Sequence, residues 1–260
     1  MTTGVAPLSP IVVAVRSVAL RLPVLYRLMQ TGRAWRVRDI LSPAYEPEFR
    51  ALPQVLPAAR VKSVIDVGAN FGQSITALLK AYPRASIQAF EPNQELAGQL
   101  SRRFASRGGI KIHPVALGEE AGTATLYMPT YNGISFPGLA SLDTVGAHRW
   151  FSAETVRWYR EGDFRAQALR VEIGRLDTYA TGADLIKIDV EGHELGVLAG
   201  GLRLIHAARP ALLVECSGTF SQVCALLEPL HYQALELVHG RWVSSQGRQL
   251  NQLFLASDPE

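Results

Sequence analysis

The residues with the clearest chemical potential form a short loop, Asp66-Val67-Gly68-Ala69-Asn70-Phe71-Gly72. The loop follows a β-branched run and precedes helical spacing, the position at which open α/β sheets bind ligands. Glycines at 68 and 72 let a ligand approach the backbone, because no Cβ stands in the way. Their spacing excludes the G-x-G-x-x-G dinucleotide fingerprint, and no Gly-Lys-Ser/Thr of a P-loop occurs. An acid before the loop favours a ligand with a positive ammonium group.

A second carboxylate ends the next strand, where Glu91 lies 25 residues after Asp66. A carboxylate there can accept hydrogen bonds from both hydroxyls of a ribose. An ammonium and a ribose together describe S-adenosylmethionine, which we expect as the cofactor. The alternatives are a glycine pair that packs against a helix and a strand end that faces solvent. The predicted cofactor-binding residues are Asp66, Gly68, Ala69, Asn70, Gly72, Glu91, Pro92, Asn93, Ala116, Leu117 and Asp189.

A later strand ends in Lys187-Ile188-Asp189-Val190-Glu191-Gly192-His193-Glu194. Alternation puts Lys187, Asp189 and Glu191 on one side of the strand end, facing the same crevice as the first loop. A hydroxyl nucleophile must lose its proton, and a positioned base contributes about 10²–10⁴-fold. We therefore predict catalytic roles for Asp189, Glu191 and His193, without deciding which one moves the proton.

Two alternatives apply to this second cluster. His193 at the start of a helix can simply face solvent. The D-x-E-x-H spacing also fits a divalent metal. We expect no metal, because Lys187 would compete for the same carboxylates.

The elements that position these residues alternate between strands and helices. Alternation of this kind predicts a parallel sheet covered on both faces. Expected strands cover 61–68, 85–92, 110–117, 183–190 and 210–217, and expected helices 74–81, 93–106 (with Asn93 as N-cap), 194–199 and 220–230. Late strands within 231–245 and 252–257 are joined by hairpin turns, one of them marked by Gly240.

Residues 123–175 break the alternation and hold 8 of the 21 aromatic residues. Long insertions without clear periodicity are usually lids or disordered, and this one is too aromatic for disorder. We expect a lid inserted in a domain of residues 58–260, preceded by an N-terminal helical segment and connector over 1–57. Aromatic faces and polar side chains suit a sugar, although the rings can also form the core of the lid. The predicted acceptor contacts are Ser141, His148, Trp150, Trp158 and Tyr159.

The N-terminal apolar run from Ile11 to Leu22 is too short to span a membrane, and Arg16 and Arg21 interrupt it. Residues 11–29 form either a basic amphipathic helix on an anionic membrane or a helix that packs on protein. A net charge of +3 over 260 residues does not favour nucleic acid. Two cysteines exclude a disulfide framework, so we expect a cytoplasmic protein, with the inner membrane surface as a further location.

These motifs together resemble the FkbM family of S-adenosylmethionine-dependent methyltransferases. The resemblance covers about residues 46–256 and rests on the segments 66–72, Phe-Glu-Pro-Asn at 90–93, Ala-Leu-Gly at 116–118, Leu-Asp at 176–177 and 187–194. It implies an α/β class I methyltransferase (Rossmann-like) fold, with a mostly parallel seven-stranded sheet whose last strand is antiparallel and helices on both faces. It also implies adenine-side contacts near 113–117, a ribose contact by Glu91, and Asp189 near the methionine end and the acceptor.

The resemblance further implies methylation of a hydroxyl on a sugar, a glycolipid or a natural-product scaffold. The alternatives are N-methylation of a related small molecule and a non-catalytic fold kept for protein association. We expect a small-molecule or glycosyl acceptor as partner, no nucleic acid, and either a monomer or a homo-oligomer. A methyltransferase acting on bases is disfavoured, because the Asn-Pro-Pro-Tyr-like sequence that holds a flipped base is missing.

Overall fold

The computed structural model describes residues 47–148, 151–152, 156, 158–216 and 218–257. The chain divides into two compact units. The sheet unit comprises 44–124 and 171–260, and the insertion unit contains 125–170. Residues 1–46 of the predicted N-terminal segment, which include the stretch 11–29 expected either to bind a membrane or to pack on protein, lie outside the described residues.

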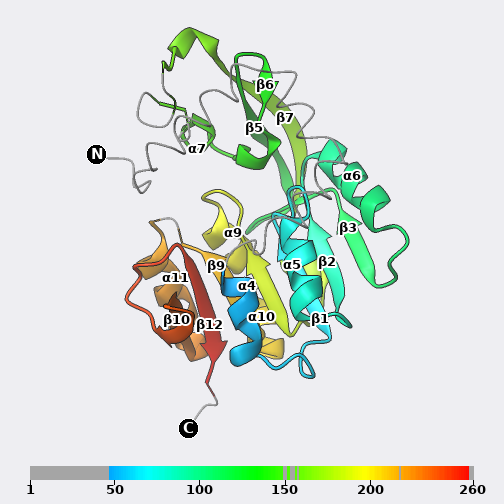
Figure 1. The fold of residues 1–260 in the computed structure, drawn as a ribbon, viewed down its shortest axis with the longest axis vertical. Helices are drawn as coiled ribbons and strands as arrows, with labels where there is room; N and C mark the ends of the chain where they lie inside the picture. Colours follow the sequence, from blue (N-terminus) through cyan, green and yellow to red (C-terminus); the bar gives the residue numbers. More distant parts are fainter. Residues whose placement is uncertain (1–46, 149–150, 153–155, 157, 217, 258–260) are drawn as a thin grey trace. The chain divides into compact units, whose positions relative to one another are not determined.

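The sheet unit is built on eight strands (Figure 1). They are β1 (Ser63–Val67), β2 (Ser86–Phe90), β3 (Ile110–His113), β8 (Leu185–Ile188), β9 (Ala211–Glu215), β10 (Tyr232–Val238), β11 (Arg241–Ser244) and β12 (Asn251–Ala256). Their order is β11-β10-β12-β9-β8-β1-β2-β3. Strands β3, β2, β1, β8 and β9 pair in parallel, and β12 is antiparallel to β9 and β10. The expected mostly parallel sheet with an antiparallel last strand is confirmed.

The sheet has one strand more than the seven that the family resemblance implies. The additional strand is β11, which forms a hairpin with β10 at the edge of the sheet. The hairpin turns at His239 and Gly240, whose φ angles are 49° and 77°. Positive φ at both central residues matches the twist of a two-residue hairpin, so the predicted turn at Gly240 is correct. The Trp242 indole of β11 donates a hydrogen bond to the carbonyl oxygen of Ala51, at 3.0 Å.

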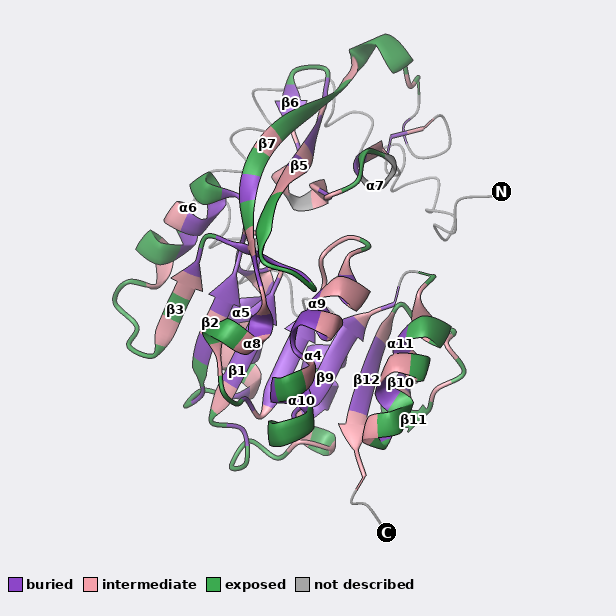
Figure 2. Ribbon diagram, turned by 180° about the vertical axis from the view of Figure 1, so that it is seen from behind, coloured by how far each residue is buried: buried purple, intermediate pink, exposed green. Residues whose placement is uncertain are grey.

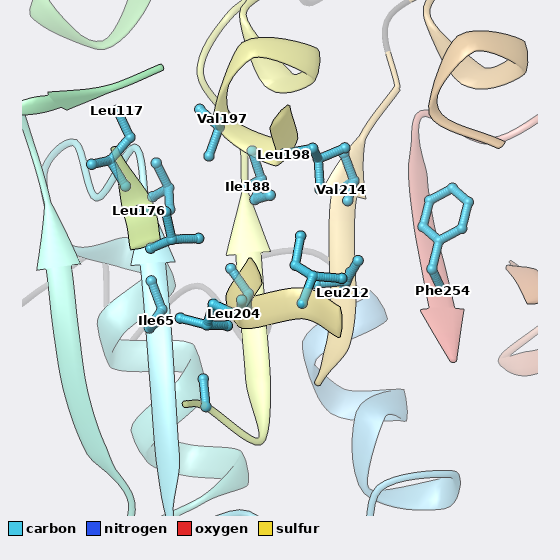
Figure 3. Close-up of a cluster of buried hydrophobic side chains, with 14 of the residues drawn as sticks. Ile65, Leu117, Leu176, Ile188, Val197, Leu198, Leu204, Leu212, Val214 and Phe254 are labelled. Atoms are coloured by element: carbon cyan, nitrogen blue, oxygen red, sulfur yellow. The ribbon is translucent and has the colours of Figure 1, made fainter. Parts of the chain in front are cut away.

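Helices cover both faces of the sheet. On one face lie α4 (Pro47–Ala51), the 3₁₀ turn η1 (Leu52–Gln54), α5 (Gln73–Ala81) and α6 (Gln94–Phe104). On the other lie α8 (Leu176–Tyr179), α9 (Glu194–Gly200), α10 (Leu202–Ala208) and α11 (Phe220–Leu227). Figure 2 shows that buried residues run along the central strands between them, and Figure 3 shows part of the cluster under α8 to α11. The larger unit thus already includes α4 and η1, upstream of residue 58, because Phe49 and Leu52 are core residues.

Two predicted elements divide, and a third is followed by a helix that the sequence did not predict. The predicted strand 110–117 divides at Pro114 into β3 and β4 (Ala116–Leu117), which belong to different sheets, because proline has no N–H for the ladder. The helix after residue 194 ends at Gly200-Gly201 as predicted, and a second helix, α10, follows it directly. The predicted helix 220–230 is α11 followed by a 3₁₀ turn, η4 (Glu228–Leu230), which contains Pro229.

The insertion is more regular than the sequence predicts. A second sheet has the order β4-β7-β5-β6, with β5 (Gly122–Tyr131), β6 (Ile134–Ser135) and β7 (Phe164–Gly174). The short helical pieces are η2 (Pro137–Leu139), α7 (Thr144–His148) and η3 (Glu161–Asp163). Within the insertion unit, Tyr131, Phe136 and Phe151 pack in a hydrophobic cluster with Ile134 and Val156. Most of the aromatic rings of the insertion therefore form the core of the insertion unit. This was the alternative to the prediction that they contact a sugar.

Within the part of the chain that the structure describes, no helix has both the length and the apolar content needed to span a bilayer.

Candidate active site

The loop after β1 packs closely against its neighbours. The amides of Gly68 and Ala69 both donate to the carbonyl oxygen of Phe90, at 3.0 Å. A Cβ at Gly68, where φ is +79°, would lie 1.8 Å from the carbonyl oxygen of Asp189. A Cβ at Gly72, where φ is +83°, would lie 2.7 Å from the Leu100 side chain of α6. The absence of a Cβ at both glycines thus allows the loop to pack against Asp189 and α6. Contact of these glycines with a cofactor stays a prediction.

A buried lysine joins the two predicted carboxylate clusters. The Lys187 Nζ atom lies 3.4 Å from Asp66 Oδ1 and 3.4 Å from Asp189 Oδ2. It also donates to the carbonyl oxygens of Val67, at 3.2 Å, and Gly68, at 2.9 Å. The Asp66 Oδ2 atom accepts a hydrogen bond of 2.6 Å from Ser74, the second residue of α5. One ammonium thus faces two carboxylates and leaves a net negative charge at the ends of β1 and β8.

Glu91 ties the loop after β2 to the loop after β1. Its Oε2 accepts the amide of Asn70 at 2.8 Å, and its Oε1 accepts the amide of Asn93 at 2.9 Å. The Asn93 side chain in turn caps α6 by accepting the amides of Glu95 and Leu96, as predicted. Burial raises the pKa of Glu91 to about 7, although the hydrogen bonds from Asn93 and Asn70 act to lower it.

A carboxyl group that sequence reasoning missed lies beside Asp189. Strands β8 and β9 are parallel with Ile188 opposite Val214, so Asp189 and Glu215 are the next residues in register. Burial and a hydrogen bond with Asp189 raise the pKa of Glu215. Burial acts to raise the pKa of Asp189 as well, but Lys187 and the bond with Glu215 outweigh it and leave that pKa lowered. The sequence did offer one signal for Glu215: like Glu91, it lies at the end of a predicted parallel strand, where ligand-binding residues are expected.

The loop from Glu191 to Glu194 turns sharply. Glu191 has φ 53° and Gly192 has φ 103°, so the strand alternation predicted for Glu191 does not continue beyond Asp189. The Glu194 Oε1 atom accepts the amides of Val190, at 3.2 Å, and Gly192, at 2.9 Å, and so closes this turn. Glu194 thus has a structural part in the site that the sequence did not reveal.

The His193 ring packs toward β4. A Cβ on Gly196 would lie 2.6 Å from His193 Nε2, and a Cβ on Gly118 would lie 3.1 Å from it. The adjoining Ala116 and Leu117, predicted to lie on the adenine side, are both buried, and Leu117 is part of a core cluster. The structure therefore brings Asp189 together with Asp66, whereas it places the His193 ring beside the Ala-Leu-Gly segment.

A sequence profile described as the Methyltransferase FkbM domain matches residues 66–247, well over half of the chain. The chain belongs to the FkbM methyltransferase family. The predicted family is thus confirmed, and the strand order of the sheet unit fits the expected class I, Rossmann-like fold.

Two curated proteins resemble this FkbM family member over about half of its length. Methyltransferase sdnD of Sordaria araneosa is 33% identical over 158 residues, which are 53% of this chain and 59% of that protein. The 2-O-methyltransferase NoeI of Sinorhizobium fredii is 24% identical over 157 residues, 56% of this chain and 60% of that protein. The chain therefore aligns with about six-tenths of the length of these curated relatives. The crystal structure of methyltransferase FkbM from Methylobacillus flagellatus is 18% identical, covers 75% of this chain and 43% of that one, and has a TM-score of 0.48.

The insertion unit of this FkbM family member holds a polar group beside its aromatic cluster. The Tyr159 hydroxyl donates to Glu161 Oε2 at 2.6 Å and lies 3.1 Å from His148 Nε2. Trp158 is 56% exposed and has φ 62°, an unusual conformation for a bulky residue. Ser141 is buried, and its backbone pairs with that of Tyr127. The fifth predicted acceptor residue, Trp150, lies outside the described residues.

The donor set at the ends of the parallel strands fits S-adenosylmethionine. The positive sulfur of this molecule suits the net negative charge of Asp66, Lys187 and Asp189. Its ribose hydroxyls suit the Glu91 carboxylate. In the described ranges, no group of three or more His, Cys, Asp or Glu side chains is placed to hold a metal ion.

Proposed function

We propose that this protein is an S-adenosylmethionine-dependent O-methyltransferase that acts on a hydroxyl of a sugar, a glycolipid or a natural-product scaffold. The observation that carries the proposal is the pair of ion contacts of 3.4 Å that join Asp66, Lys187 and Asp189 at the ends of β1 and β8. The printed name of the relative NoeI, a 2-O-methyltransferase, supports O-methylation.

Each residue of the site has a separate role in the proposed reaction. Glu91 would accept the ribose hydroxyls, and the anionic cluster around Lys187 would favour the sulfonium and the ammonium of the methionine part. Asp189 would orient the acceptor hydroxyl and take its proton, since its side chain is 26% exposed whereas that of Asp66 is fully buried. When bound, S-adenosylmethionine would supply the methyl group. A lone pair of the acceptor oxygen would form the new O–C bond, and the electrons of the broken C–S bond would stay on sulfur. Orientation in line can account for about 7–11 kcal/mol of such a barrier.

The insertion unit is the proposed source of acceptor contacts. Trp158 exposes an aromatic face, and His148, Tyr159 and Glu161 provide donors and acceptors for sugar hydroxyls. Since Ser141 is buried, its proposed part is to hold the backbone of β5 through Tyr127. The proposal includes a glycolipid as acceptor. In that case residues 11–29 would bind an anionic membrane. Co-sedimentation of the full chain with anionic liposomes tests this binding.

Calorimetry with S-adenosylmethionine tests the cofactor, and transfer of a radiolabelled methyl group to a panel of sugars, glycolipids and amines tests the reaction. We expect saturable binding that Glu91→Ala weakens by at least about tenfold, in line with loss of a buried, charge-assisted contact. We expect transfer to hydroxyl acceptors that Asp189→Asn reduces by about 10²-fold or more. Transfer to amines alone, undiminished in Asp189→Asn, would contradict the proposal.

A further inference from the structure

Strand β9 ends in Glu215, a carboxyl group to which the proposed reaction assigns no role. Glu215 follows Val214, which is opposite Ile188 in the parallel register of β9 and β8. Residues that follow a register pair in two parallel strands point to the same face of the sheet. Glu215 and Asp189 therefore extend from adjacent strands to one face, and their side chains are joined by a hydrogen bond.

The charges around this pair decide which carboxyl group carries a proton. Lys187 contacts Asp189 and Asp66, and its remaining polar contacts include the backbone carbonyls of the first loop. The strongest electrostatic effects on Glu215 come from Asp189, Glu191 and Glu194, and all three are acidic. Two adjacent carboxylates cannot both ionise easily, so the one without the ammonium keeps its proton.

The hydrogen bond therefore has a direction. Burial, then the bond with Asp189, then the acidic neighbours raise the pKa of Glu215, whereas Lys187 stabilises Asp189 as the anion. A protonated carboxyl has one O–H donor, and an ionised carboxylate only accepts. Glu215 thus donates and Asp189 accepts.

We propose that Glu215 is a positioning residue for the methyl transfer. Glu215 donates a hydrogen bond to Asp189 and so holds the Asp189 carboxylate in the orientation in which it accepts the proton of the acceptor hydroxyl. The inference rests on the proposed function. Two contacts from different strands, with Lys187 of β8 and with Glu215 of β9, then define where the Asp189 carboxylate lies. The proton balance is simple: the acceptor hydroxyl gives its proton to Asp189, and Glu215 keeps its own throughout.

Three variants of the full chain separate this role from a merely structural one. Glu215→Gln keeps a hydrogen-bond donor that cannot ionise. Glu215→Leu keeps bulk and removes the donor. Glu228→Gln makes the same chemical change at an exposed glutamate of η4 and is the matched control.

The first measurement needs no acceptor. Infrared spectra of protein labelled with ¹³C-glutamate, recorded at pH 8, show protonated carboxyl groups as a separate C=O band. We expect part of this band to disappear in Glu215→Gln and to remain unchanged in Glu228→Gln. An unchanged band in Glu215→Gln would overturn the proposal, because Glu215 would then be ionised at that pH.

The second measurement compares kcat, the acceptor KM and the Kd of S-adenosylmethionine. We expect Glu215→Gln to keep kcat within about threefold, and Glu215→Leu to lose about tenfold to 10²-fold in kcat with little change in KM and Kd, since small misplacements of a reacting group have effects of this size. An equal loss in both variants would overturn the positioning role. If Glu215→Leu does not fold, the infrared band and the kcat of Glu215→Gln still decide. If wild type transfers no methyl group, the proposed function fails, whereas the band separately decides whether Glu215 holds the proton.

Discussion

Glu91 predicts a pH dependence of stability with a definite sign and size. Burial raises its pKa in the folded protein from the ordinary value of 4.5 to about 7. A carboxyl whose pKa is raised by folding stabilises the folded state when it is protonated. This contribution is therefore fully present below pH 4.5 and is lost as the pH rises through 7.

The size follows from the two pKa values. Their difference, 7 minus 4.5, corresponds to about 3.4 kcal/mol at about 1.4 kcal/mol per pKa unit. Proton linkage places about 2.5 kcal/mol of this loss between pH 5 and pH 8. Glu91 as a whole residue is 6% exposed, so solvent screens the effect little.

Urea denaturation of wild type and Glu91→Gln at several pH values between 5 and 8, without S-adenosylmethionine, measures the effect. The difference in unfolding free energy between the two proteins removes the contribution of the other titrating groups. We expect wild type to lose about 2.5 kcal/mol relative to the variant over this range. Glu95→Gln, at an exposed position in the first turn of α6, is the control and should give a constant difference. A constant difference for Glu91→Gln as well would refute the reasoning.

Three further substitutions test other contacts of the site by denaturant titration. Gly68→Ala should lower the unfolding free energy by at least about 3 kcal/mol or prevent folding, because its Cβ would lie 1.8 Å from a backbone oxygen of Asp189. Lys187→Met should cost about 3–5 kcal/mol at pH 8, since it leaves two carboxylates without their ammonium partner. At pH 5 the cost should be smaller, because the pKa of Asp189 rises without the lysine and protonation relieves the charge. Asn93→Ala should cost about 1 kcal/mol through loss of the α6 cap.

Each of these substitutions has a matched control. Gly133→Ala shares a positive φ of +71° but meets nothing within 4 Å, so it should cost about 1–2 kcal/mol. An equal cost for both glycines would contradict the steric argument. Lys111→Met, at an exposed position of β3, should be close to neutral, and a cost for Lys187→Met that does not depend on pH would count against the charge argument. Asn93→Asp should keep the cap, so an equal loss in Asn93→Ala and Asn93→Asp would show that the cap contributes little.

Local patterns predicted most of the fold because they report local causes. Strands separated by helices require a parallel sheet, and the Asn93 cap and the Gly240 turn follow from one or two residues each. The error arose where distant pairing decides. β4 separates from β3 to join a different sheet, in which it pairs with β7.

The sequence by itself determined which residues could form the site: carboxylates at strand ends, next to glycines, in an order that resembles one family. Alternation along β8 also determined that Lys187 and Asp189 share a face, because side chains repeat every two residues in a strand. The tertiary structure decided which strands are neighbours. That order brings Lys187 to Asp66, which is 121 residues earlier in the chain, and Glu215 to Asp189. The charge state of each carboxyl group depends on these neighbours, since Coulomb interactions act through space rather than along the chain.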